Sequence, residues 1–303
     1  MNIFERNAKK VVVAAVFAAS FSAIFVRLAE APPMVIGFYR LTFVMPFFTV
    51  PVLGWHRKEL MSISRKELGG SLLAGLFLSA HFFSWFTALQ YTTVASATVI
   101  CLMHPIVILG ISVLIFKEKV SFKAVAGVLV AFAGTAIISG GDYSLSKEAL
   151  FGDFMAFLGA FFMALYFLEG RKYRRNLSNT TYVFLVFGSC WAAFAVGMLA
   201  SGASFTGYSA ETFMWIFLMT LVCQIGSHAL FNWCLGYVHP LYVATLENGE
   251  ALIASALAAV IFGEFPTLWQ WIGGIVAICG IIYYNFHEAQ PVETSENKEI
   301  KRK

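Results

Sequence analysis

The sequence predicts an all-α membrane protein with ten transmembrane helices in two inverted five-helix repeats. Three observations predict this fold class: a composition that is 59% hydrophobic and only 13% charged, a series of long apolar runs, and the match of one segment to another 146 residues further on. An apolar run of about 20 residues is long enough to cross the ~30 Å hydrocarbon core of a bilayer.

Apolar runs of this length recur ten times along the chain of 303 residues. They lie near 9–29, 33–53, 68–89, 92–116, 121–140, 150–170, 180–201, 212–236, 240–262 and 267–286. The connections between them are too short for a soluble catalytic or nucleotide-binding domain, so any activity is expected within the membrane. The charged tail 287–303 is expected to be disordered.

An internal repeat explains the arrangement of these runs. The segment 115–134 aligns without gaps to 261–280, with seven of twenty positions identical. The offset corresponds to five predicted spans, and an odd number of spans means that the two copies enter the membrane in opposite directions. The chain is therefore divided into a first five-helix repeat, 1–146, and a second, inverted repeat, 147–286.

The distribution of basic residues predicts the orientation. Of the 21 Lys and Arg residues, eighteen fall in segments on one side of the predicted membrane, Lys147 falls on the other, and Arg27 and Arg40 lie within or at the edge of spans. The positive-inside rule makes the basic side cytoplasmic. Both termini are therefore expected in the cytoplasm, with the chain in a bacterial inner membrane or another plasma membrane.

Several functional classes lack their signals in this sequence. There is no HExxH, GxSxG or P-loop motif, and the five cysteines are scattered singly without metal-binding spacing. An enzyme, a metal, another cofactor or a nucleic-acid partner is therefore not expected. An ion channel is a less favoured alternative because no filter motif or Arg-rich voltage helix occurs.

A duplicated pattern, Glu-x-x-Ser/Thr-x5-Gly, makes the resemblance to one family specific. It comprises Glu118, Ser121 and Gly127 in the first half and Glu264, Thr267 and Gly273 in the second. Arg40 stands early in the second span, and His104-Pro105 stands fourteen residues before the first of these glutamates. With these features the chain resembles the EamA-type transporters of the drug/metabolite transporter superfamily.

The resemblance extends from about residue 10 to 286. It implies ten helices and a secondary transporter for small molecules, with export of amino acids or related metabolites as the leading expectation. Import and multidrug efflux are the alternatives. The implied partners are a small-molecule solute, the lipid bilayer and, as a candidate, protons. One departure is Ala251, which stands where the family often has a proline after the glutamate equivalent to Glu250.

Glu250 and His104 are related by the 146-residue offset and both fall near the middle of a span. A charged side chain at the bilayer centre costs at least about 2.5–3.5 kcal/mol and usually faces a cavity or a partner. For Glu250, handling of substrate or protons is weighed against a structural ion pair with His104 or Arg40. For His104, the alternative is a hydrogen bond that steadies the helix at Pro105.

Other polar residues of the spans are candidates of the same kind. Glu247 shares a helix face with Glu250, so the two acids could share a proton, unless Glu247 lies at a solvated cytoplasmic rim. His81 and Trp85, also four residues apart, could line a cavity for an apolar or aromatic solute or be ordinary buried residues. The remaining candidates for binding or coupling, each also explained by structural contacts, are Arg40, Gln224, His228, Asn232 and Tyr166.

A second group of residues is expected to be structural. Glu118 and Glu264 stand at turns between helices, where a carboxylate can cap the N-terminus of the following span. The glycines recur every seven residues and give two spans a small-residue face for close packing. They are Gly127, Gly134, Gly273 and Gly280, and Pro105 is grouped with them.

The orientation gives a first testable prediction. Cysteines introduced at Lys147 and at Arg174 are expected to react with a membrane-impermeant reagent from opposite sides of the membrane. The reason is the bias of eighteen basic residues to one. Labelling of both positions from the same side of intact cells would contradict the inverted repeat.

Overall fold

The structure is a computed structural model that describes residues 3–114, 121–141, 146–174, 176–238 and 240–288, in which every regular element is a helix. The elements are α1 Ile3–Ala19, α2 Ser22–Leu28, α3 Pro33–Gly54, α4 Arg57–Ser62, α5 Arg65–Tyr91, α6 Val94–Cys101, α7 His104–Leu114, α8 Phe122–Gly141, α9 Lys147–Tyr173, α10 Asn179–Ser201, α11 Ala210–Met219, the π-helix η1 Thr220–Ala229, α12 Leu230–Leu235, α13 Pro240–Glu247, α14 Gly249–Phe262 and α15 Leu268–Glu288.

Seven helical stretches of the described chain are long and apolar enough to cross a membrane. They are Asn7–Leu28, Pro33–Gly54, Arg65–Tyr91, Val94–Ile111, Lys147–Tyr173, Asn179–Ser201 and Ala210–Leu235. Three further apolar helices are shorter: Val125–Gly134, Gly249–Phe262 and Leu268–Tyr284. The all-helical, membrane-spanning class is confirmed, whereas the number of ten spans stays a prediction.

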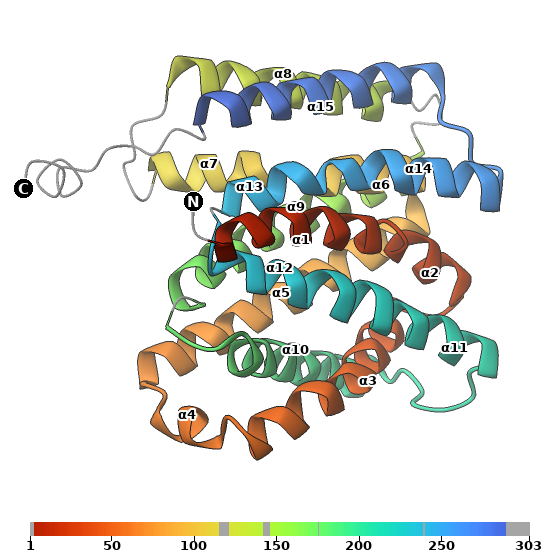
Figure 1. Ribbon diagram of the computed structural model, residues 1–303. Coiled ribbons are helices and arrows are strands. Elements are labelled where there is room, and N and C mark those ends of the chain that lie inside the picture. Colours follow the sequence, from red (N-terminus) through yellow and green to blue (C-terminus); the bar gives the residue numbers. More distant parts are fainter. Residues whose placement is uncertain (1–2, 115–120, 142–145, 175, 239, 289–303) are drawn as a thin grey trace, which may run out of the picture.

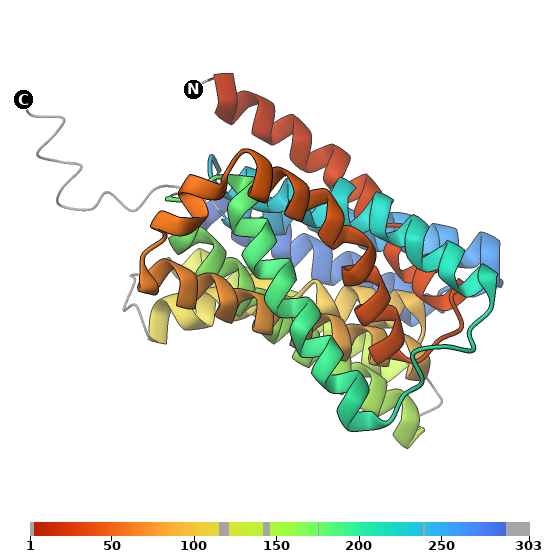
Figure 2. The ribbon, with the colours of Figure 1, turned by 90° about the horizontal axis from the view of Figure 1, so that it is seen from below.

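The helices lie alongside one another between two ends of the molecule (Figures 1 and 2). The start of α1 and the end of α15 lie at the same end (Figure 1). On the face seen in Figure 2, α10 packs against both α3 and α5, and α5 also packs along α9. The pair α8 and α15 forms a separate layer at one edge of the bundle (Figure 1).

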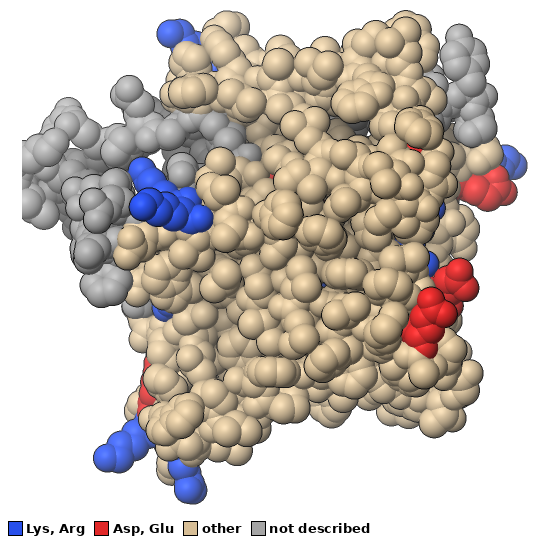
Figure 3. All heavy atoms as spheres, turned by 45° about the vertical axis from the view of Figure 1, so that its right-hand side comes forward, with Lys and Arg blue, Asp and Glu red and all other residues tan. Residues whose placement is uncertain are grey.

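The surface between the two ends is suited to lipid. Large hydrophobic side chains such as Phe17, Leu129, Val196 and Val260 are more than half exposed. Figure 3 shows the charged side chains of this face gathered toward its two sides, with a broad uncharged region between them. An apolar belt of this kind agrees with a bundle that spans a bilayer.

The predicted small-residue faces meet each other between α8 and α15. A Cβ atom added to Gly134 or to Gly280 would lie only 2.3 Å from a backbone nitrogen of the opposite helix, so both positions require glycine. Gly127 lies against the carbonyl of Gly280, and Gly134 lies against that of Gly273. This order of contacts means that the two helices run antiparallel. In lipid, the hydrophobic effect does not drive helices together, so van der Waals packing at this close backbone approach is what stabilises the pair.

Four of the apolar stretches are interrupted near their middle. The break between α1 and α2 follows Ser20, whose hydroxyl donates to the Val16 carbonyl at 2.9 Å. Between α6 and α7 the break falls at 102–103, just before Pro105, which occupies the first turn of α7, where a missing N–H costs nothing. Asn248 separates α13 from α14, and its amide donates to the Ala244 carbonyl at 3.1 Å.

The fourth interruption is the π-helix η1, which replaces α-helical geometry between α11 and α12. Short π-helical segments are rare and often mark functional sites. Irregular backbone at membrane depth is tolerated where protein buries it or where it lines a cavity. The four interruptions are therefore expected to lie in the interior of the bundle, beside protein or a cavity and away from lipid.

The role expected of Glu264 needs a correction. Its carboxylate does not cap α15, whose first turn is held instead by reciprocal hydrogen bonds between Thr267 and Gln270. Glu264 forms an ion pair with Arg27 at 2.5 Å and accepts a hydrogen bond at 3.2 Å from the backbone nitrogen of Val94, so it caps α6. The corresponding expectation for Glu118 lies outside the described residues.

A second carboxylate joins distant helices at a connection outside the apolar stretches. Glu59 in α4 accepts hydrogen bonds from the backbone and hydroxyl of Ser178, both at 2.6 Å, and from Thr181 at 2.7 Å, at the N-terminus of α10. Burial raises the pKa of Glu59, but these bonds and the nearby His56 outweigh it and hold the pKa below its usual value. The hydrogen bonds between Glu59 and the N-terminus of α10 are therefore present at neutral pH and weaken as acid protonates the carboxylate.

The glycine contact between α8 and α15 gives a prediction about stability. Gly280→Ala places a methyl group against backbone that cannot yield like a flexible side chain, and overpacking of this kind costs about 1–3 kcal/mol. Gly274→Ala, on the same helix, is the control because nothing lies within 4 Å of its added Cβ. Melting temperatures of the two variants in detergent should differ clearly, with the loss confined to Gly280→Ala; equal melting would refute the close approach.

Candidate functional site

A small cavity of about 40 Å³ lies where the interrupted helices meet. Its wall includes Ala19 and Leu102 beside two of the breaks, Glu247 at the end of α13, and Ser227 in η1. The continuous helices α5 and α9 also contribute, with His81 and Met163 among their lining residues. All four interruptions thus contribute to one cavity, which is where broken membrane helices place solute and ion sites.

His104 and Glu247 form a buried pair in this wall. The Nε2 atom of His104 lies 3.1 Å from Oε2 of Glu247, and both side chains are at most 3% exposed. The other ring nitrogen, Nδ1, lies 3.4 Å from the carbonyl of Cys101, and a carbonyl can only accept a hydrogen bond. Nδ1 is then the donor, and Nε2 faces the carboxylate of Glu247.

This pair decides two of the alternatives left open by the sequence. The partner of His104 is Glu247 and not Glu250, which is its counterpart by the 146-residue offset. The placement of Glu247 at a solvated rim is wrong, because its side chain is 3% exposed in the interior. The break at Asn248 lies between the two glutamates, yet both line the cavity.

Glu250 differs from its neighbour in having no fixed partner. It lines the cavity and is partly exposed, and within the described part of the chain its carboxylate forms neither a hydrogen bond nor an ion pair. Neither His104 nor Arg40 contacts it, so the proposed structural ion pairs of Glu250 are not formed.

Arg40 is fully buried and does not belong to the lining of the cavity. Its Nε donates to Oε1 of Gln224 at 2.5 Å, and its guanidinium lies 4.4 Å from the ring centroid of Phe82. A weaker contact of 3.4 Å reaches the hydroxyl of Ser22. The amide carbonyl oxygen of Gln224 and an aromatic face therefore hold this cation.

Three of the polar candidates, Gln224, His228 and Asn232, stand four residues apart on the eighth predicted span, but they make different contacts. Gln224 binds Arg40, while His228 lines the cavity. Asn232 turns back and donates to the carbonyl of His228 at 3.0 Å. The π-helical turn changes the angular spacing of these residues, so the four-residue spacing no longer keeps them on one face. Tyr166 is fully buried in α9 and is not part of the lining either.

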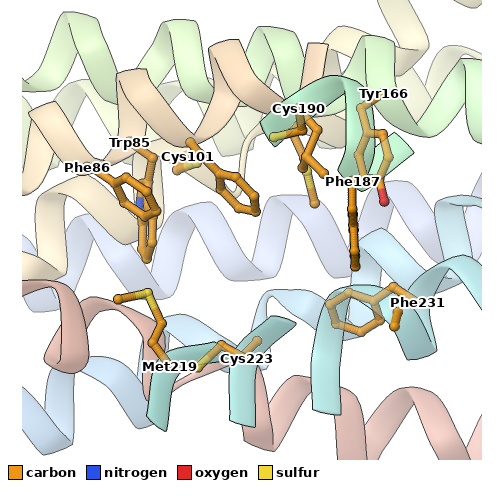
Figure 4. Close-up of a cluster of buried hydrophobic side chains, with 14 of the residues drawn as sticks. Trp85, Phe86, Cys101, Tyr166, Phe187, Cys190, Met219, Cys223 and Phe231 are labelled. Carbon is orange, nitrogen blue, oxygen red and sulfur yellow. The ribbon is translucent and has the colours of Figure 1, made fainter. Parts of the chain in front are cut away.

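His81 and Trp85 lie together in the cavity wall. Their rings are stacked with centroids 6.5 Å apart and an angle of 5° between the planes. The Nδ1 atom of His81 lies 2.9 Å from the carbonyl of Gly159 in α9, which fixes the orientation of the ring. Figure 4 shows Trp85 extending from α5 toward the stretch that carries Met219 and Cys223.

Several residues of the cavity were not singled out from the sequence. Thr98 and Ser227 place buried hydroxyls in the wall that have no hydrogen-bond partner within the described chain, and Met163 and Phe231 supply apolar surface. Hydroxyl and apolar residues are common throughout membrane helices, so their type alone carried no signal. Among the described residues, no group of His, Cys, Asp and Glu is arranged to hold a metal ion.

With a bundle of membrane helices around a polar cavity, the molecule has the form of a membrane carrier for small molecules. The chain belongs to the EamA-like transporter family, whose model matches residues 10–140 and again residues 150–286. The expected membership is thereby confirmed. The protein is therefore a membrane transporter for a small-molecule solute.

Similar proteins in other organisms include transporters without an assigned solute. An uncharacterized transporter of Archaeoglobus fulgidus is 25% identical over 269 residues, which cover 88% of this chain and 92% of the relative. The uncharacterized transporter YxxF of Bacillus subtilis is 25% identical and covers 72% and 70% of the two chains. The aromatic amino acid exporter YddG of Escherichia coli is 26% identical over 180 residues, or 56% of this chain and 59% of YddG.

A solved crystal structure shares the fold. It superimposes with a TM-score of 0.66, covering 95% of this chain and 99% of the other, at 19% sequence identity. Likeness at this identity concerns the arrangement of helices and not the solute.

The difference between the two glutamates predicts a difference in stability. His104→Ala strands the Glu247 carboxylate in the interior, and breaking a buried pair in this way costs about 3–5 kcal/mol. Glu250→Gln removes a carboxylate without a fixed partner and should cost little. The melting temperature in detergent should fall strongly for the first variant alone; a loss of similar size in Glu250→Gln would mean that Glu250 is a structural counter-ion.

Proposed function

We propose that this transporter is a secondary carrier that exports amino acids or related small metabolites by alternating access. The observation that carries the proposal is the cavity where four interrupted helices meet around Glu250, a carboxylate without a fixed partner in the described chain. A carboxylate inside a membrane protein costs free energy, so carboxylates at such positions usually mark the path of a solute or an ion. Interrupted helices also supply backbone that can change conformation at the site.

The size of the cavity agrees with a moving site. One water requires about 10–15 Å³ measured in the same way, so the ≈ 40 Å³ present hold a few waters and not an amino acid. Binding of a solute then requires the surrounding helices to separate. In an alternating-access cycle, this structure corresponds to a form with the site closed around little more than its own side chains.

The proposed architecture is ten transmembrane helices in two inverted repeats, 1–146 and 147–286, followed by a cytoplasmic tail, with both termini in the cytoplasm. Two observations support it. The family model matches the chain twice in succession, and the glycine-bearing helices α8 and α15, which are equivalent in the two repeats, pack antiparallel.

An amino acid with an apolar or aromatic side chain fits the chemistry of the wall. Trp85, Phe231 and Met163 provide apolar surface beside the polar groups. The name of YddG describes an aromatic amino acid exporter, and this relative is 26% identical over part of the chain. Chemistry on the solute is not part of the proposal, so the protein is taken to act without enzymatic activity.

Transport in proteoliposomes tests the proposed function. The purified protein should move members of an amino acid panel in a saturable manner, measured at two pH values to detect coupling to protons. Glu250→Gln should lower the initial rate at least about tenfold, the loss of roughly 1.4 kcal/mol of interaction, while Glu148→Gln, an exposed carboxylate outside the cavity, should not.

Two results would count against the proposal. Flux that rises linearly with concentration and never saturates would indicate a channel instead of a carrier. A Glu250→Gln protein that transports at the rate of the parent would remove the carboxylate from the solute path.

A further inference from the structure

The hydrogen-bonding character of the cavity wall follows from the ring of His81. Its Nδ1 contacts the carbonyl of Gly159, so Nδ1 carries a hydrogen and donates it. No carboxylate contacts the ring within the described chain, and a buried charge without such a partner is unfavourable, so the ring is neutral. In a neutral imidazole the second nitrogen is then an acceptor. Nε2 of His81 therefore offers a lone pair and no hydrogen.

The carboxylate of Glu250 is a second acceptor at the same cavity. Its neighbour Glu247 is engaged by His104, whereas Glu250 has no hydrogen bond or ion pair in the described chain. Both His81 and Glu250 thus present lone pairs that nothing in the described wall uses.

Besides Nε2 of His104 and Oε2 of Glu247, which face each other, three polar atoms of the lining are buried without a hydrogen-bond partner in the described chain. They are Oγ1 of Thr98, Oγ of Ser227 and Nδ1 of His228. Buried polar atoms in proteins are satisfied in the large majority of cases. Unsatisfied atoms around one small cavity therefore indicate a polar ligand group that enters it.

No Lys or Arg is among the described residues that line the cavity. Arg40 is sealed behind Phe82 and bound to Gln224, so its guanidinium is not presented to the cavity. A solute carboxylate would meet the like-charged carboxylate of Glu250 and no Lys or Arg charge. A group with several N–H donors and a positive charge would meet Glu250, Nε2 of His81 and hydroxyls, which can accept as well as donate. Aromatic rings such as Trp85 also attract cations.

We propose that the cavity recognises its solute by a protonated primary amine, with Glu250 holding the charge and Nε2 of His81 accepting one N–H. The inference rests on the proposed carrier function and adds the chemical group of the solute that the site recognises. Binding does not depend on a contact between the solute carboxylate and a positive charge in the cavity wall. Removal of the carboxylate from an amino acid should therefore be tolerated, whereas removal of the amine should not.

A matched series of ligands tests this directly. Phenylalanine, phenethylamine and 3-phenylpropanoate share one aromatic body and differ in the presence of the amine and the carboxylate. Binding of each to the purified protein is measured by calorimetry and by competition with transport in proteoliposomes. The expected order is that phenethylamine binds at least as well as phenylalanine, and that 3-phenylpropanoate binds at least about tenfold more weakly.

Two cavity variants and one control complete the experiment. Glu250→Gln should abolish the preference for the amine, His81→Gln should reduce amine affinity severalfold, and Glu148→Gln should leave it unchanged, with melting curves verifying that each protein is folded. Equal binding of the acid and the amine, failure of the amine to bind the parent protein, or an intact preference in Glu250→Gln would each overturn the proposal.

Failure of this inference is distinguishable from failure of the carrier function. Saturable transport of solutes that lack an amine would leave the carrier standing and remove the amine site. Tight binding of phenethylamine without transport of any solute would keep the amine site and remove the carrier.

Discussion

The structure depends on one constraint: polar groups and irregular backbone inside a membrane protein must be buried in protein or face a cavity, because hydrocarbon offers no hydrogen bonds. Four apolar stretches break near their middle, and all four breaks contribute to the same cavity. Around it, the polar side chains contact one another or line the cavity. Arg40 donates to Gln224 and lies over the ring of Phe82, and His104 lies in ion-pair contact with Glu247. Glu250 is left without a fixed partner in the described chain, and that sets it apart.

Regular features of the sequence predicted the all-helical membrane class and the contact between the glycine-bearing helices. Apolar runs and paired glycines depend on period and spacing, which a sequence states directly. The faces that carry Gly134 and Gly280 do meet, because only glycine permits backbones to approach so closely. The interior positions of His104 and Glu250 also followed from the cost of placing such groups in lipid, whereas that of Glu247 was left open against a solvated rim.

Contacts between distant segments could not be predicted in the same way. The sequence offset paired His104 with Glu250, but the ring contacts Glu247 instead. A π-helical turn, which no spacing rule anticipates, divided the stripe of Gln224, His228 and Asn232. Glu264 caps a helix 170 residues earlier in the chain than itself and pairs with Arg27. Such partners arise from the packing of whole helices, which local patterns do not specify.

The central claim is that this cavity opens to both sides of the membrane and holds the solute. Ser227 is fully buried, lines the cavity and differs from cysteine by one atom. The most direct measurement is labelling of Ser227→Cys, in a chain whose five native cysteines are replaced, by an impermeant thiol reagent added to either side. The predicted result is labelling from both sides and protection by a transported solute. Labelling from one side only, or labelling that the solute does not slow, would contradict it.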